Sequence, residues 1–109
     1  MATPGPSRPV RGSETGRPIM VLLDLLGRRW SLRILYELRE APESFRALRT
    51  RCGNVSPSVL NARLAELRES GLVELREGEG YALTRWGREI GQHLMALDDV
   101  AKRWARSRR

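Results

Sequence analysis

The sequence predicts a single, mainly α-helical (α+β) domain in which one β-hairpin interrupts a series of helices. Three observations lead to this fold class. Apolar residues recur at helical spacing between residues 19 and 70, alternate with polar residues around a Gly-Glu-Gly turn at residues 72–84, and return to helical spacing over residues 85–105. A chain of 109 residues has room for one hydrophobic core, so we expect one folded domain over residues 18–109.

Residues 1–17 are rich in Pro, Gly, Ser and Arg and show no periodic apolar pattern. Such a segment cannot offset its ordering entropy by burial, so we predict a flexible basic N-terminal arm. The net charge of +7 is concentrated at the two ends, because residues 1–18 hold three Arg and one Glu and residues 98–109 hold five Lys or Arg and two Asp. This distribution favours a polyanionic partner, nucleic acid or an anionic membrane surface, although it also serves solubility alone.

Three helices are expected in the first half of the chain. The first covers residues 19–26, IMVLLDLL, and ends at Gly27. The second covers about 30–40, because Pro42 prevents its continuation. A short third helix covers about 44–51, with Ser44 as its N-cap. The apolar face of the second helix comprises Trp30, Ile34, Leu35 and Leu38.

A fourth helix, about residues 56–70, begins with Ser56 as N-cap and Pro57 as its first residue, and ends at Gly71. Leu60, Leu64 and Leu67 form one stripe, and the other side carries only short residues, Ser58, Asn61, Ala62 and Ala65. With the third helix it predicts a helix-turn-helix, whose slim face suits a DNA major groove about 12 Å wide. The alternative is a helix buried on two sides, or an Ala-rich surface.

Side chains at the start of the fourth helix have the chemistry to contact DNA. Asn61 can bond adenine through both its donor and its acceptor, and Ser56 and Ser58 suit base or phosphate contacts. The helix-turn-helix also carries a basic excess that favours phosphate contacts. The expected phosphate contacts here are Arg46, Arg49 and Arg63.

The hairpin formed by strands 72–77 and 81–84 makes the unit a winged helix-turn-helix. Arg76 on its first strand can reach a flanking phosphate. The tip, residues 77–80, is short and acidic, so we expect DNA to repel it.

The last helix, about residues 85–105, is capped by Thr84 and carries an apolar stripe for five turns. This stripe is too long for a body of this size to cover. It predicts a two-fold homodimer in which helices 85–105 and 19–26 form the interface, with His93 beside the stripe. The alternative is a last helix packed wholly on its own core. The expected interface residues are Met20, Leu23, Trp86, Ile90, Leu94, Leu97, Ala101 and Trp104.

The single Cys and single His exclude a disulfide framework and a His/Cys zinc cluster, and we expect no metal, no cofactor and no enzyme active site. The longest apolar run is far short of a membrane span, so a cytoplasmic, nucleoid-associated protein without a membrane role is expected. Cys52 lies near Arg49 and Arg51, which permits a lowered pKa and redox sensing, although a small turn residue is the simpler interpretation.

Residues 20–92 resemble the HxlR-type winged helix-turn-helix transcriptional regulators. The motifs that carry the resemblance are Gly27-Arg28-Arg29-Trp30, the Ser56-Pro57 start of the fourth helix, and Leu83-Thr84 followed by Gly87. The resemblance implies a bacterial, homodimeric, DNA-binding regulator with residues 56–70 in the major groove. It places base-reading roles on Ser56, Ser58, Asn61 and Ala62, and it favours phosphate contacts by Arg28 and Arg29 over mere solvation of a helix junction.

We therefore expect a sequence-specific dimeric regulator that binds double-stranded DNA and responds to an unknown small-molecule or redox effector. The alternative is a winged-helix protein-interaction module without specific DNA binding. The acidic wing tip and the nearly balanced charge of the body support that alternative.

Overall fold

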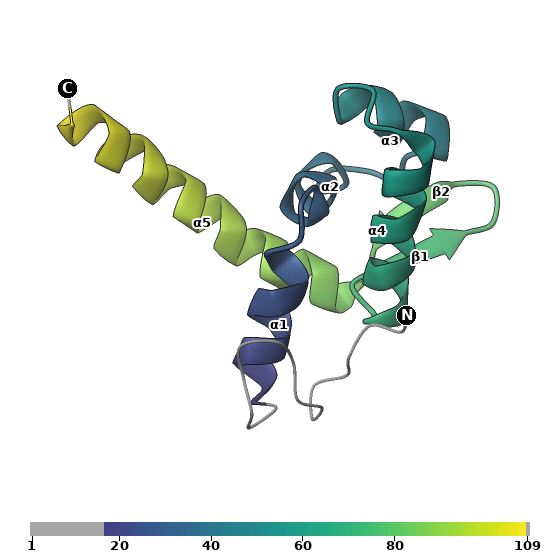
Figure 1. The fold of residues 1–109 in the computed structure, drawn as a ribbon, viewed down its shortest axis with the longest axis horizontal. Coiled ribbons are helices and arrows are strands. Elements are labelled where there is room, and N and C mark those ends of the chain that lie inside the picture. Colours follow the sequence, from purple (N-terminus) through teal and green to yellow (C-terminus); the bar gives the residue numbers. More distant parts are fainter. Residues whose placement is uncertain (1–16, 109) are drawn as a thin grey trace.

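The computed structural model describes residues 17–108, and it confirms the predicted order of elements (Figure 1). Except for Arg17, the predicted arm lies outside the described residues. None of the described helices is long and apolar enough to cross a membrane. The elements are α1 (Pro18–Leu26), α2 (Ser31–Glu37), α3 (Phe45–Arg51), α4 (Pro57–Glu69), β1 (Val73–Arg76), β2 (Gly80–Leu83) and α5 (Arg85–Ser107).

Three helices begin at the side-chain caps that the sequence predicts. The Ser44 hydroxyl accepts a hydrogen bond from the Ala47 amide at 3.0 Å, and the Ser56 hydroxyl accepts one from the Val59 amide at 3.3 Å. Thr84 does the same for α5 and also donates to the Gly71 carbonyl at 2.6 Å. The caps therefore set where α3, α4 and α5 start, and Thr84 ties the start of α5 to the end of α4.

Helix α4 ends in a Schellman motif at Gly71, which lies at φ +83°. The Leu72 amide donates to the Leu67 carbonyl at 2.9 Å, and the Gly71 amide donates to the Arg68 carbonyl at 3.1 Å. This left-handed position favours glycine because a Cβ would crowd the backbone there. The motif turns the chain sharply from α4 into β1.

Helix α2 is shorter than the predicted span of 30–40. Trp30 precedes it at φ +79°, in the left-handed region, and the helix ends at Glu37. The chain leaves the helix early because Glu43 must reach the hairpin, where it exchanges two backbone hydrogen bonds with Tyr81, at 2.9 and 2.8 Å. This isolated β-bridge adds a third, one-residue segment to the sheet of the wing, and no sequence pattern predicts it. Strands β1 and β2 pair antiparallel, with Val73 opposite Leu83.

The core forms where the leucine ridge of α4 meets α2, α3 and the wing. Leu60, Leu64 and Leu67 are no more than 1 % exposed, so the inward orientation predicted for this ridge is confirmed. Each such side chain contributes roughly 1.5–3 kcal/mol through burial. The other core residues are Leu25, Ile34, Leu35, Leu38, Leu48, Cys52, Val55, Leu72, Val73 and Leu83.

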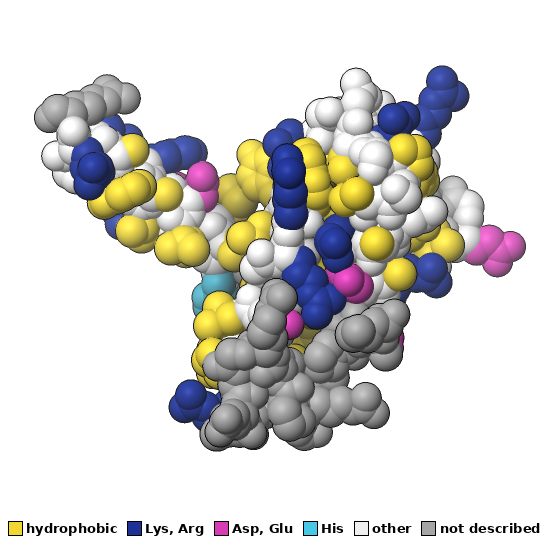
Figure 2. Space-filling model, viewed as in Figure 1, with side chains coloured by type: hydrophobic (Ala, Val, Ile, Leu, Met, Phe, Trp, Pro, Cys, Tyr) yellow, Lys and Arg dark blue, Asp and Glu magenta, His cyan; other side chains and the backbone are white. Residues whose placement is uncertain are grey.

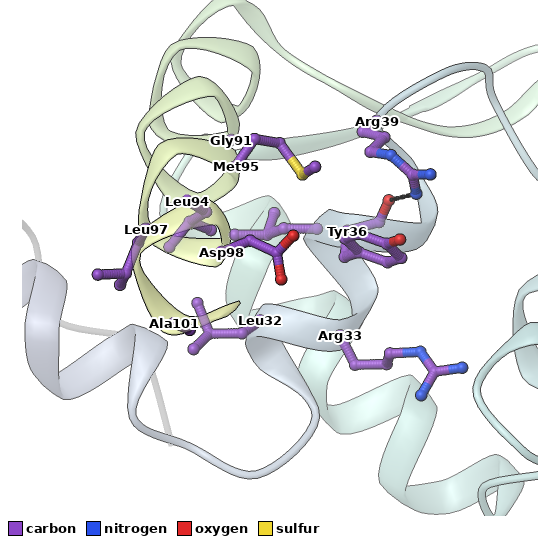
Figure 3. Close-up of a pocket in the computed structure, with 11 residues that line it drawn as sticks. Leu32, Arg33, Tyr36, Arg39, Gly91, Leu94, Met95, Leu97, Asp98 and Ala101 are labelled. Carbon is purple, nitrogen blue, oxygen red and sulfur yellow. Dashed lines mark hydrogen bonds between the residues drawn. The ribbon is translucent and has the colours of Figure 1, made fainter. Parts of the chain in front are cut away.

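Helix α5 starts against the wing and leaves the body, so that its C-terminal half projects away (Figure 1). Hydrophobic side chains continue along the projecting part (Figure 2). Near the body, α5 runs beside α2, and a groove lies between these two helices (Figure 3).

Candidate nucleic-acid interface

The outward face of α4 carries the side chains that the sequence assigns to base reading. Ser56, Ser58, Asn61 and Ala62 are all exposed, opposite the buried leucine ridge. The Ser56 oxygen accepts the cap hydrogen bond but keeps its own O–H as a donor. The N-terminal half of α4 therefore presents a narrow polar surface, with small side chains, that can approach base edges closely.

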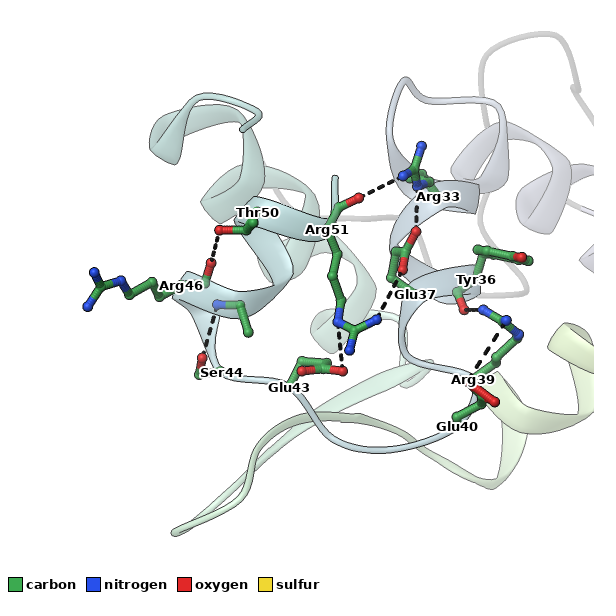
Figure 4. A network of polar contacts seen from close by, with 11 residues as sticks. Arg33, Tyr36, Glu37, Arg39, Glu40, Glu43, Ser44, Arg46, Thr50 and Arg51 are labelled. Carbon is green, nitrogen blue, oxygen red and sulfur yellow. Dashed lines mark hydrogen bonds and ion pairs between the residues drawn. The ribbon is translucent and has the colours of Figure 1, made fainter. Parts of the chain in front are cut away.

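Arg46 on α3 is an exposed cation of the helix-turn-helix. Its side chain is exposed and points away from the neighbouring polar network (Figure 4). Among the described residues it has no carboxylate within ion-pair distance. Arg29, at the α1–α2 junction, is also exposed, and its guanidinium lies 5.3 Å from the centre of the Trp30 ring. Both charges are accessible to an anion.

Arg28 and Arg63, also predicted to contact phosphate, share one acid instead. Glu66 accepts from Arg28 at 2.8 Å and from Arg63, and Arg28 also pairs with Asp24 at 3.3 Å. Both arginines are about three-quarters buried, with side-chain exposures of 25 % and 24 %. The cluster fastens the α1–α2 junction to α4. The carboxylates of this cluster neutralise much of the arginine charge that would otherwise be available to DNA phosphates.

Arg49 and Arg76 are held by their own local contacts. The Arg49 Nε donates to the Val55 carbonyl at 2.8 Å, which fixes the turn between α3 and α4. Arg76 pairs with Glu74 at 2.6 Å and with Glu79 at 3.9 Å. The hydrogen bond to Glu74 raises the pKa of Arg76 above its ordinary value. The wing therefore carries its own counter-charges.

A network of ion pairs and hydrogen bonds joins α2 to α3 (Figure 4). Arg33 pairs with Glu37 at 2.7 Å and donates to the Arg51 carbonyl at 2.6 Å, at the end of α3. Arg51 in turn pairs with Glu43 at 3.0 Å. Lateral movement of α2 would thus be transmitted to α3. The sequence does not predict the contacts of Arg51 in this network, since Glu43, Glu37 and Arg33 lie 8, 14 and 18 positions away from it.

The buried thiol of Cys52 lies beside this network and does not have the lowered pKa expected from its sequence neighbours. Burial raises the pKa of Cys52, Arg33 partly offsets that rise, and Glu37 adds to it. The side chain is only 1 % exposed. A buried thiol with a raised pKa is a poor nucleophile, so the structure contradicts the lowered pKa that the sequence permits and favours the simpler interpretation of Cys52 as a small turn residue. Among residues 17–108 no cluster of His, Cys, Asp or Glu is arranged to hold a metal ion.

The exposed stripe of α5 has the spacing of a coiled-coil seam. Trp86, Leu97, Val100 and Trp104 are 54 %, 59 %, 47 % and 61 % exposed. With Ile90 and His93 they alternate between steps of four and three residues, the pattern by which two helices pair. We call these six residues the α5 seam. Val100 belongs to the seam as well, although it is not among the predicted interface residues; its spacing of three residues from Leu97 and four from Trp104 is the sequence signal for it.

The predicted interface residues outside the most exposed part of the seam differ in their exposure. Ile90 and Leu94 are half-buried and pack partly on the chain's own core. Leu23 on α1 and Ala101 on α5 are exposed, and Met20 is half-buried. Large exposed apolar surfaces mark contact sites, so α1 and α5 both offer surface to a partner.

The described residues thus combine a helix-turn-helix, a hairpin wing and a long terminal helix, which defines a winged helix-turn-helix protein. The model of the HxlR-like helix-turn-helix family matches residues 25–109. The chain belongs to this family, and is accordingly an HxlR-type DNA-binding transcription regulator.

Relatives and solved structures agree with this assignment. The chain is 31% identical over 99 residues to the HTH-type transcriptional regulator sll1512 of Synechocystis sp., covering 84% of this chain and 73% of that protein. It is 33% identical over 88 residues to MJ0925 of Methanocaldococcus jannaschii, also named an HTH-type transcriptional regulator, covering 76% of this chain and 78% of that protein.

Two solved structures share the fold. A possible HxlR family transcriptional factor from Thermoplasma volcanium superposes with a TM-score of 0.70 at 31% identity, covering 78% of this chain and 82% of that one. Quinone-bound YodB from Bacillus subtilis superposes with a TM-score of 0.66 at 28% identity, covering 82% of this chain and 94% of that one.

Proposed function

We propose that the protein is a two-fold dimer that binds specific DNA sequences in the cytoplasm, on the nucleoid, and regulates transcription by occupying them. The observation that carries this proposal is the face of α4, whose exposed Ser58, Asn61 and Ala62 lie opposite a ridge of fully buried leucines. Contacts by Arg46 and Arg29 to phosphate supply affinity, and side chains on residues 56–62 supply discrimination. Arg28, Arg49, Arg63 and Arg76 contribute less, because each is already engaged.

The dimer half of the proposal rests on the α5 seam and on α1. Pairing of two seams would cover Leu97, Val100 and Trp104, which the chain itself leaves exposed. Two recognition helices related by a two-fold axis read half-sites about 34–36 Å apart, so the target is a pseudo-palindrome. Selection of bound fragments from genomic DNA, followed by alignment of the recovered sequences, tests this. Recovery of fragments without any shared inverted repeat would contradict it.

A second candidate function is a protein-interaction module that binds DNA only non-specifically. The acidic wing tip favours it, because Glu77 and Glu79 are exposed where the fold would approach DNA. The same selection at physiological salt separates the two functions: enrichment of no sequence would favour the interaction module.

An effector also belongs to the proposal. The YodB structure carries a quinone, so a protein of this fold binds a small ring molecule. We propose that this chain likewise responds to a small molecule.

Replacement of Asn61 by alanine is expected to weaken binding to the selected operator by about 1–3 kcal/mol and to relax preference at one base pair. The Asn61 side chain is an exposed amide of α4, so it can donate and accept through two separate atoms, as a bidentate bond to adenine requires. Fluorescence anisotropy against operators varied one base pair at a time measures the effect. Gln92→Ala is the matched control, since it removes an exposed amide from α5, outside the helix-turn-helix. Unchanged preference at every position in Asn61→Ala would remove Asn61 from the reading face.

Replacement of Arg46 by alanine is expected to weaken binding to all sequences alike. Loss of one phosphate contact per chain should reduce the slope of log K against log salt by about 0.9 for each half-site. Titrations between low and moderate salt measure the slope. Arg103→Ala removes the same charge from the exposed surface of α5 and serves as control. Equal slopes in the two variants would show that Arg46 acts only through net charge.

A further inference from the structure

The groove between α2 and α5 has the size and lining of a small-molecule site (Figure 3). Its volume is about 400 Å³, within the range of roughly 300–1,000 Å³ typical of ligand pockets. Side chains of both helices point into it, and several of the apolar ones are exposed although they lie in a concave surface. The residues on which the argument depends are Leu32, Tyr36, Gly91, Leu94 and Met95.

Every charged side chain at the rim of this groove already has a partner. Arg33 pairs with Glu37 at 2.7 Å, and Asp98 pairs with Lys102 at 3.0 Å. Arg39 pairs with Glu40 at 3.9 Å, donates to the Tyr36 carbonyl at 2.8 Å and stacks 3.9 Å from the centre of the Tyr36 ring. A charged ligand would therefore lose hydration without gaining an unpaired counter-charge. An uncharged ligand would lose little and would bury apolar surface.

The groove adjoins the seam proposed for dimerisation at Leu97 but otherwise lies on another side of α5. Met95 faces α2, whereas Val100 lies in the seam; five residues of helix place them about 140° apart around the α5 axis. Leu97 lies at the edge between the two surfaces. A partner helix on the seam would therefore leave the side of α5 that carries Gly91 and Met95 open.

We propose that this groove binds a small, uncharged, apolar molecule of two or three rings, which packs against Tyr36, Met95 and the surrounding leucines. Methionine sulfur makes favourable contacts with aromatic rings, and Tyr36 offers a ring edge. As a regulatory site the groove rests on the proposed function. Arg33 lines it and also holds the last carbonyl of α3, so a ligand that displaces α2 would move the helix-turn-helix.

The test uses two fluorescent probes that differ by one charged group, N-phenyl-1-naphthylamine and its sulfonate, 8-anilino-1-naphthalenesulfonate. Titration of the full chain is expected to show saturable binding of one neutral probe per chain. The sulfonate should bind at least tenfold more weakly. Equal or tighter binding of the sulfonate would overturn the ligand class.

Two variants of α5 decide the location. Gly91→Leu places a leucine side chain in the groove, and its Cβ would meet only the Leu83 Cδ1, at an ordinary contact distance of 4.0 Å. It should weaken binding of the neutral probe at least tenfold. Met95→Trp, at the rim of the groove, should do the same. Ala96→Leu adds the same side chain at an exposed position outside the groove and should bind as the wild type does. Wild-type affinity in Gly91→Leu would overturn the site.

Two further outcomes separate the ligand from other occupants and from the DNA function. Absence of saturable probe binding, together with a weaker dimer in Gly91→Leu, would assign the groove to a second copy of the chain and overturn the proposal. Addition of the neutral probe should change the affinity of the wild-type protein for the selected operator at least threefold. The affinity of Gly91→Leu for the operator should not change. No change would overturn the regulatory role alone, because the probe titration requires no DNA.

Discussion

If the proposed dimer forms through the α5 seam, Leu97→Glu is expected to convert it into a monomer and to remove measurable binding to the selected operator. Leu97 is 59 % exposed in the single chain and is not part of its core, so the monomer should fold as before. In a paired seam, however, each chain would bury one uncompensated carboxylate, at a cost of about 3–5 kcal/mol apiece. The dimer dissociation constant should then rise by at least about a thousandfold.

Sedimentation velocity at micromolar concentration and operator titration measure the two consequences of Leu97→Glu. Ala96→Glu is the matched control, because Ala96 is exposed on α5 but lies outside the seam. A Leu97→Glu chain that remains as dimeric as Ala96→Glu would remove the seam from the interface. A monomeric Leu97→Glu chain with wild-type operator affinity would instead separate DNA binding from dimerisation, contrary to the two-half-site mechanism.

The features that the sequence predicts well are those set by neighbours in the chain. Ser44, Ser56 and Thr84 precede their helices by one residue, so their capping role follows from local geometry. The leucine ridge of α4 repeats every three or four residues, and the buried side of the helix follows from that period.

The features that escape prediction depend on contacts between distant segments. Glu66 pairs with both Arg28 and Arg63 only because the fold brings the α1–α2 junction to α4. The sequence alone therefore cannot show whether the charge of Arg28 is paired within the protein or available to DNA. Cys52 shows the same limitation: nearby arginines in the sequence suggest a lowered pKa, but burial in the core has the larger effect. Similarly, the spacing of apolar residues in the sequence predicts one continuous surface on α5. In the structure these residues are divided between the seam and the groove.

Gly87→Ala is expected to destabilise the fold by about 2–3 kcal/mol, although alanine favours helices over glycine. A Cβ at Gly87 would lie 2.1 Å from the Leu72 carbonyl oxygen. The first turn of α5 must therefore move away from the wing. That movement strains the hydrogen bond from the Thr84 amide to the Leu72 carbonyl, now 3.0 Å, and the bond from the Thr84 hydroxyl to the Gly71 carbonyl, now 2.6 Å.

Gly91→Ala, one turn later on α5, provides the control for Gly87→Ala. Its Cβ would meet only the Leu83 Cδ1, at an ordinary contact distance of 4.0 Å. The higher helix propensity of alanine should then stabilise the protein by about 0.5–1 kcal/mol. Urea unfolding of both variants at one protein concentration should shift the midpoints in opposite directions. If both variants are stabilised, α5 does not pack closely against the end of α4, and the anchoring of α5 by Thr84 and Gly87 is wrong.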